Sequence, residues 1–185
     1  MTAPLSRARS NVPVDEAAVH AAVASVDDPE YPGISIVDLG LLETLDIELL
    51  DVEEAERAVG STRCRVTVGL VPTFSGCPAL AVIAEDVSAA VAALPGVSAV
   101  EVRWLATPVW SPDRVSHDAR QILADSFTVA VQINGLQVGS QRSGTQASCP
   151  RCGELTNEQS MFGPSRCRSV HRCSGCGEAI EVLRA

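Results

Sequence analysis

The sequence predicts an α+β fold, a small mixed sheet packed with helices, followed by a separate cysteine-rich module at the C-terminus. Two observations predict it. Segments with helical and with alternating apolar spacing follow one another in the order α-β-β-α-β-α between residues 14 and 134. Five of the seven cysteines then fall between Cys149 and Cys176, in a stretch too short for an apolar core of its own.

The first half of the chain opens with a tail over residues 1–13 that we expect to be disordered. A helix is predicted from Asp15, which can cap it, to the Asp28–Pro29 step, because the residue before a proline avoids helical backbone angles. DPEYPG is typical of a turn, and the apolar, β-branched run after it predicts a strand. An acidic loop at 51–60 leads to RCRVTVGLV, whose alternation predicts a second strand that forms a hairpin with the first.

The second half continues with a helix in ALAVIAEDVSAAVA, where apolar residues recur at helical spacing until Pro95–Gly96 ends it. VSAVEVRW alternates like a strand, and SHDARQILADS predicts a short helix that Ser116 caps. FTVAVQI predicts a last strand. Residues 135–148 are rich in Gly, Ser and Gln and are expected to form a linker to the module at 149–185.

Charge and composition exclude several classes of function. The formal net charge of −9 argues against broad binding to nucleic acid or to anionic membranes, because such binding depends on cationic side chains that neutralise phosphates. The N-terminus lacks the apolar segment of a secretory signal, and no run approaches the length of a membrane span. An odd number of cysteines with CxxC pairs fits a reducing compartment. We therefore expect a cytoplasmic protein.

The C-terminal module has the spacing of a zinc ribbon. Two CxxC pairs separated by twenty residues supply the thiolates that close a tetrahedral site, which makes the metal structural. Zinc is the expected ion, with iron in a rubredoxin-like site as the alternative. The predicted ligands are the cysteines of the two pairs, Cys149, Cys152, Cys173 and Cys176.

Three cysteines remain outside this set. Cys64 lies on the apolar face of its predicted strand and is expected to be buried and inert. Cys167 is either a small buried hydrophobe or a functional thiol. Cys77 directly precedes Pro78 at a helix start, where backbone amides favour a thiolate. It is therefore a candidate nucleophile or soft-metal ligand, and otherwise a cysteine packed under the helix.

Carboxylates form a second set of candidates. Asp28 and Glu30 flank Pro29, and Asp38 ends an apolar run. Such residues do acid–base chemistry or bind hard metals in some proteins, and terminate helices or build turns in more of them.

The motifs together resemble a known family. DPEYPGISIVDLGLL, a hairpin and then VPTFSGCPA, in which Thr73 precedes Cys77–Pro78, are similar to the SufT-like family of iron–sulfur cluster assembly proteins. TPVWSPDRVSHDARQIL and the tail CPRCG…FGPSRCRSVHRCSGCGE resemble the PaaD-like branch, which accompanies the phenylacetyl-CoA epoxidase system. The resemblance runs from about Asp15 to the C-terminus.

This resemblance implies a maturation factor rather than an enzyme. It implies that residues 14–134 form an iron–sulfur assembly domain that helps to assemble or insert a metal or iron–sulfur centre. The implied partners are the oxygenase and the reductase of the epoxidase system, and the implied cargo is iron or a transient iron–sulfur cluster. The motif positions that match the handling site are Cys77, Thr73, Asp28, Glu30 and Asp38, with Cys167 as a further candidate.

Three alternatives remain open from the sequence. The chain is a structural subunit of a multicomponent oxygenase that transfers nothing, or a general maturation factor of the SufT-like kind. The third is a thiol enzyme that uses Cys77, although no base is placed by the sequence to activate that thiol.

Overall fold

The computed structural model describes residues 14–50, 64–132 and 147–183. The predicted tail, the acidic loop and most of the predicted linker lie outside these ranges. The described elements in chain order are α1 (Glu16–Ala24), β1 (Asp27–Asp28), β2 (Tyr31–Ser35), β3 (Leu42–Leu49), β4 (Cys64–Leu70), α3 (Ala79–Ala92), β5 (Val97–Trp104), the 3-10 helix η1 (Pro112–Arg114), α4 (His117–Phe127), β6 (Val129–Val131), β7 (Thr156–Ser160), β8 (Arg168–Cys173) and β9 (Ala179–Leu183).

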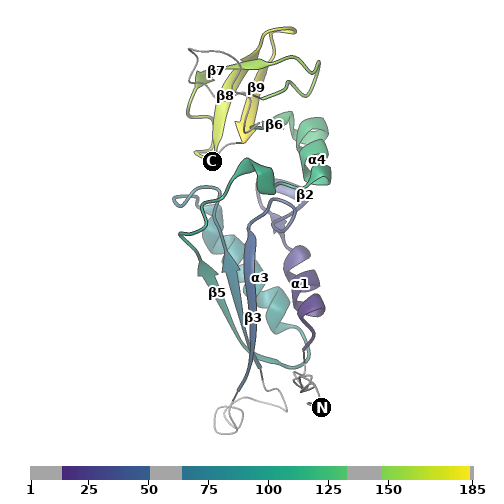
Figure 1. Ribbon diagram of the computed structural model, residues 1–185, viewed down its shortest axis with the longest axis vertical. Helices are drawn as coiled ribbons and strands as arrows, with labels where there is room; N and C mark the ends of the chain where they lie inside the picture. The colour runs from purple at the N-terminus through teal and green to yellow at the C-terminus, as the bar shows by residue number, and fades with distance from the viewer. Residues whose placement is uncertain (1–13, 51–63, 133–146, 184–185) are drawn as a thin grey trace, which may run out of the picture.

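The lower part of the molecule in Figure 1 is a three-stranded sheet covered by α1 and α3. Its order is β3-β4-β5, with β3 antiparallel and β5 parallel to β4, so the predicted α+β class, the hairpin and the mixed sheet are confirmed. Alternate residues of β4, from Cys64 to Leu70, are buried against the helices. On α3 the predicted face is also buried, at Ile83, Val87 and Val91. The core is mainly aliphatic, as the scarcity of aromatic residues requires, with Tyr31 and Trp110 as buried aromatic members.

A short hairpin of β1 and β2 stands next to the start of α3 and positions the DPE motif. The loop after β2 is held by the segment that contains η1. Trp110 is buried and donates from Nε1 to the Leu39 carbonyl at 2.9 Å, and Arg114 donates from Nε to the Gly40 carbonyl at 2.7 Å. Gly40 has a φ of +74° and an added Cβ would lie 2.6 Å from the Arg114 carbonyl oxygen, so both its backbone conformation and this close approach require glycine.

The ribbon forms the upper part in Figure 1, and its sheet has the order β6-β9-β8-β7. β7, β8 and β9 are an antiparallel meander, whereas β6 runs parallel to β9. β6 follows α4 directly, through Thr128 in the left-handed conformation (φ 56°). The strand predicted at the end of the first domain therefore hydrogen-bonds with the ribbon, which no local sequence pattern indicates.

The predicted boundaries can be compared with this sheet. Ala147 is buried and Ser148 forms a β-bridge with Leu155, so the last two positions of the predicted linker belong to the ribbon structure. The division of the chain at residue 134 into independent domains stays a prediction.

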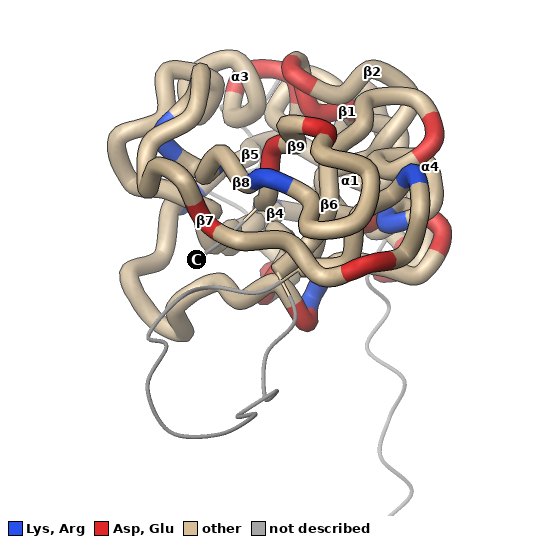
Figure 2. Tube along the Cα trace, turned by 90° about the horizontal axis from the view of Figure 1, so that it is seen from above, with Lys and Arg blue, Asp and Glu red and all other residues tan. Residues whose placement is uncertain are grey.

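Surface charge and helix length bear on the excluded classes. In Figure 2 the acidic positions are spread over the described part of the molecule, and the basic positions form no continuous band in this view. Among the described residues, no helix is both long enough and apolar enough to cross a membrane.

Candidate metal centre and inter-domain thiol site

The four cysteines of the two CxxC pairs meet at one end of the ribbon sheet. Their sulfur atoms all lie within 4.8 Å of one another, with 3.8 Å between Cys149 and Cys176 and 3.3 Å between Cys152 and Cys173. Tetrahedral zinc with Zn–S bonds of about 2.3 Å places sulfur atoms about 3.8 Å apart. The donor set and its spacing therefore fit a metal ion of this kind.

The backbone around the second CxxC pair prepares one of these sulfurs, that of Cys173, for a metal. The amides of Cys176 and Gly175 donate to Sγ of Cys173 at 3.5 and 3.3 Å. The Cys176 amide, followed by the Cys152 side chain and the Gly175 amide, lowers the pKa of Cys173 to about 6, because these contacts stabilise the thiolate. Metals bind thiolates, so the loop supplies part of the ligand chemistry before any ion is bound.

Cys77 lies at the start of α3, one residue before the N-cap position, which Pro78 occupies. The predicted thiolate is wrong for the free protein, since the pKa of Cys77 is raised. Burial is the main cause, and the carboxylates of Glu30 and Asp28 add to it, while the Ala79 amide and Arg168 oppose it. The helix start does supply the expected amide, but desolvation and two negative neighbours outweigh it.

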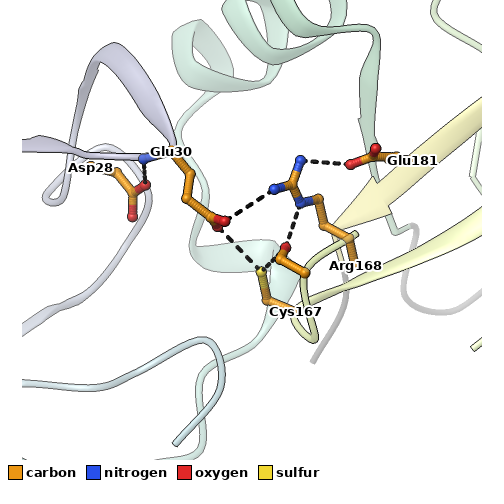
Figure 3. Close-up of polar contacts among 6 residues, drawn as sticks. Asp28, Glu30, Cys167, Arg168 and Glu181 are labelled. Carbon is orange, nitrogen blue, oxygen red and sulfur yellow. Dashed lines mark hydrogen bonds and ion pairs between the residues drawn. The ribbon is translucent and has the colours of Figure 1, made fainter. Parts of the chain in front are cut away.

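Cys167 reaches from the ribbon into the same group of charges, as Figure 3 shows. It is only 6% exposed, its Sγ lies 3.1 Å from the Ser165 hydroxyl, and it donates to Oε2 of Glu30 at 3.8 Å. Burial is the main reason that its pKa is raised, and the charges of Glu30 and Cys77 act in the same direction. The two candidate thiols, one from each part of the chain, are therefore electrostatic neighbours.

Arg168 joins the two parts of the molecule beside these thiols. Its guanidinium pairs with Glu30 at 3.2 Å and with Glu181 at 2.6 Å, and donates to the Ser165 hydroxyl at 2.7 Å (Figure 3). The guanidinium carbon also lies 5.3 Å from the ring centroid of Tyr31, a cation–π geometry. The single guanidinium thus pairs with two carboxylates, one from the assembly part and one from the ribbon.

Asp28 and Tyr31 complete the group. Oδ1 of Asp28 accepts from the Glu30 amide at 2.8 Å, so this carboxylate builds the turn, as the more common reading of such residues predicts. Burial is the main reason that the pKa of Asp28 is raised, and the Glu30 charge adds to it. Burial likewise raises the pKa of Tyr31, whose hydroxyl is buried with no hydrogen-bond partner in the described part of the chain.

The other two motif residues are placed differently. Oδ2 of Asp38 accepts from the Ser35 hydroxyl at 2.8 Å, and its carbonyl accepts from the Ser116 amide at 2.8 Å, which fixes the turn after β2. Thr73 is half-buried in the loop before α3. Within the described ranges, no hydrogen bond or ion pair joins Asp38 or Thr73 to either candidate thiol.

Sequence reasoning missed Arg168, Glu181 and Tyr31 as members of this group. Arg168 follows a motif cysteine directly, which is the one signal that could have drawn attention to it. Its partner Glu30 lies 138 positions away, so no local pattern could pair them.

Comparisons with known proteins place the chain in a family. The model described as "Iron-sulfur cluster assembly protein" matches residues 16–104, and the one described as "PaaD zinc beta ribbon domain" matches residues 135–184. The Bacillus subtilis protein named "Fe-S protein maturation auxiliary factor YitW" is 34% identical over 99 residues, which are 54% of this chain and 83% of that protein. The chain belongs to the iron–sulfur cluster assembly protein family. The predicted resemblance is confirmed, as is its class of assembly factor rather than enzyme.

Two further relatives extend over different lengths. An Escherichia coli protein, provisionally named as a subunit of 1,2-phenylacetyl-CoA epoxidase, is 26% identical over 172 residues, 90% of each chain. A crystal structure of the domain of unknown function DUF59 from Bacillus anthracis has a TM-score of 0.47 and 28% identity, and covers 60% of this chain and 92% of its own. The iron–sulfur assembly match thus ends at residue 104, whereas the E. coli relative shares the ribbon as well.

Proposed function

We propose that this chain assists the assembly or insertion of an iron–sulfur or metal centre in the oxygenase, or its reductase, of a phenylacetyl-CoA epoxidase system. Membership of the assembly family supports the maturation role. The E. coli relative, which is similar over 90% of both chains, supports the choice of system. The match of the ribbon to the PaaD model adds to that choice.

Iron or a transient cluster is the cargo in this proposal, and Cys77 is the residue that handles it. The observation that supports the proposal is that Cys167 donates to the Glu30 carboxylate, whose charge raises the pKa of both Cys167 and Cys77. Two thiols and a carboxylate are ligands that suit iron and its clusters. Asp28 belongs to the same group of charges. Thr73 and Asp38 shape the loops on either side.

The ribbon has a separate role in the proposal. Cys149, Cys152, Cys173 and Cys176 hold zinc, which keeps this small module folded and leaves no coordination position for a substrate. The folded ribbon then presents Cys167 to the assembly domain and docks the client protein. A cytoplasmic location fits this proposal, because an odd number of cysteines with CxxC pairs suits a reducing compartment.

The experiment replaces Cys77 with serine and co-produces the variant with the oxygenase and reductase under anaerobic conditions. We expect both variant and wild type to fold with equal zinc content, and the client of the variant to lose most of its iron and acid-labile sulfide. Cys64→Ser is the control, because Cys64 is also a thiol whose pKa is raised by burial, although it is fully buried and donates to the Gly96 carbonyl. Normal metal content in the client made with Cys77→Ser would overturn the role of Cys77.

A second candidate function is a structural subunit that transfers nothing, and the name of the E. coli relative, which calls that protein a subunit, favours it. It predicts a stoichiometric complex with the oxygenase that survives gel filtration and is indifferent to Cys77→Ser. A maturation factor instead gives a mature client that keeps its activity after the factor has been removed.

A further inference from the structure

The Glu30 carboxylate is shared between two neighbouring residues of the ribbon. Its Oε1 lies 3.2 Å from Arg168, and its Oε2 lies 3.8 Å from Sγ of Cys167. A thiolate and a carboxylate oxygen bound to one tetrahedral divalent ion, with bonds of about 2.3 and 2.1 Å, lie about 3.6 Å apart. The Cys167–Glu30 separation is therefore close to that of two ligands of a single metal.

Arg168 also forms an ion pair with Glu181, which does not depend on Glu30. The guanidinium lies 2.6 Å from Glu181 and 2.7 Å from the Ser165 hydroxyl, both in the ribbon. If Glu30 turned to another cation, the charge of Arg168 would remain paired. The longer contact, at 3.2 Å, is the one that crosses to the assembly part.

A buried polar atom without a partner lies in the same place. Tyr31 is 2% exposed, its ring lies under the Arg168 guanidinium, and its hydroxyl has no hydrogen-bond partner among the described residues. Such atoms are rare in folded proteins, because an unmade buried hydrogen bond costs about 1–3 kcal/mol. A water bound to a metal ion in this cluster would supply a partner for that hydroxyl.

We propose that Cys167 and Glu30 are ligands of a second metal site, between the two parts of the molecule, that takes a thiophilic divalent cation and is closed by Arg168 when empty. The proposal rests on the proposed function, since the ion is cargo handled beside Cys77. On binding, Cys167 gives its thiol proton to the solvent, the thiolate and the Glu30 carboxylate bind the cation, and Arg168 stays with Glu181.

The remaining coordination positions belong to water or to Cys77. Among the described residues, the ribbon cysteines are the one group with three or more ligand atoms within 4.8 Å. The inter-domain pair is therefore a partial site, as suits a cation that is passed on rather than kept.

The test uses cobalt(II) as the probe and the full chain with zinc already in the ribbon. Zinc is retained there because it binds such sites more tightly than cobalt does, and zinc content is measured before and after the titration. We expect the near-ultraviolet charge-transfer absorption of a cobalt–thiolate bond in the wild type and in Cys64→Ser. The band should disappear or fall by about half in Cys167→Ser, and the dissociation constant should rise about tenfold or more in Glu30→Gln.

Arg168→Gln tests whether the Arg168–Glu30 ion pair closes the empty metal site. Removing the competing cation should lower the dissociation constant for cobalt roughly fivefold, the equivalent of a partly exposed ion pair. Unchanged affinity in this variant would overturn the role given to Arg168.

Two further results would overturn the site. One is the absence of a thiolate band in the wild type. The other is a band that survives Cys167→Ser and Glu30→Gln but is lost in Cys77→Ser, which would leave the proposed function standing with Cys77 alone as the ligand. Client maturation in Cys77→Ser is measured separately. It tests the proposed function, whereas cobalt binding tests the Cys167–Glu30 site, so either proposal can fail without the other.

Discussion

Arg168, the first residue of β8, forms a 3.2 Å ion pair with Glu30, which lies between β1 and β2 and is 138 positions away in the chain. Within the described ranges it is the ion pair that links the ribbon to the assembly part. The two side chains are 15% and 32% exposed, so solvent screens this pair less than a surface pair. The contact therefore contributes both to stability and to the placement of Cys167.

A double-mutant cycle on Glu30→Gln and Arg168→Gln should give a coupling free energy of about 1 kcal/mol in urea unfolding at low salt. The pair of Glu101 and Arg103 is the matched control. It is shorter, at 2.7 Å, but its side chains are about half exposed, and we expect no measurable coupling. Equal coupling free energies in the two cycles would show that placing the pair between the ribbon and the assembly part does not strengthen it.

Removing the ribbon metal should affect more than the ribbon. β6 is parallel to β9 and follows α4 without a linker, so loss of the ribbon sheet frees β6 and the end of α4. We expect a chelator to abolish amide protection in β6, β8 and β9, and to leave protection in β4 and α3 unchanged, as measured by hydrogen exchange. Retained protection in β6 would contradict this coupling.

The sequence predicts the local elements of this fold well, for physical reasons. Asp15 and Ser116 cap their helices as expected, and alternation in β4 marks its buried face, because caps and alternation act over a few residues. The β1–β2 hairpin was predicted only as a turn, since its strands are too short for a period to be visible. The pairing of β6 with β9 was missed because parallel neighbours leave no turn signal.

The site was predictable in part, for a related reason. The four ribbon ligands follow from spacing, since each CxxC pair is local. The direction of the Cys77 pKa shift does not follow from spacing, because it depends on burial and on the charges of Glu30 and Asp28 across the fold as well as on the Ala79 amide. The same holds for Tyr31, whose position beneath Arg168 is set by the contact between the two parts.

Tyr31→Phe should not destabilise the protein, and should raise the free energy of unfolding by up to about 1 kcal/mol, because it removes a buried hydroxyl without a partner. The ring contacts remain, including the edge contact with Phe127 at a centroid distance of 5.3 Å. Thr156→Val is the control. Its buried hydroxyl donates to the Ala147 carbonyl at 3.0 Å and lies 2.9 Å from Nδ1 of His171, so its loss should cost about 1–2 kcal/mol.

The two unfolding midpoints in urea decide this prediction. Destabilisation by Tyr31→Phe equal to that by Thr156→Val would mean that the tyrosine hydroxyl has a partner in solution. A stable Tyr31→Phe variant with weaker cobalt binding would instead tie the unpaired hydroxyl to the metal site.

Cys64 gives a pH dependence whose sign follows from its burial. Burial in β4 raises the pKa of this thiol, so the folded state holds the proton more tightly than the unfolded state does. Above the ordinary thiol pKa of about 8.5 the folded state binds more protons, and stability therefore falls as pH rises toward the raised value. Below that window the contribution of Cys64 is fully present.

Cys64→Ala removes this titration together with the packing of the sulfur. At pH 7 the variant should be less stable than the wild type by about 1–2 kcal/mol, because the substitution leaves a small cavity in a fully buried position. The difference should shrink steadily from about pH 8.5 to pH 10, since only the wild type loses the Cys64 contribution there. Urea unfolding of both reduced, zinc-loaded proteins across this range measures it. A difference that stays constant would mean that the Cys64 thiol titrates alike in the folded and unfolded states, and one that widens would mean that its pKa is lowered in the folded state. The hydrogen bond to the Gly96 carbonyl argues against both, because that bond requires the proton.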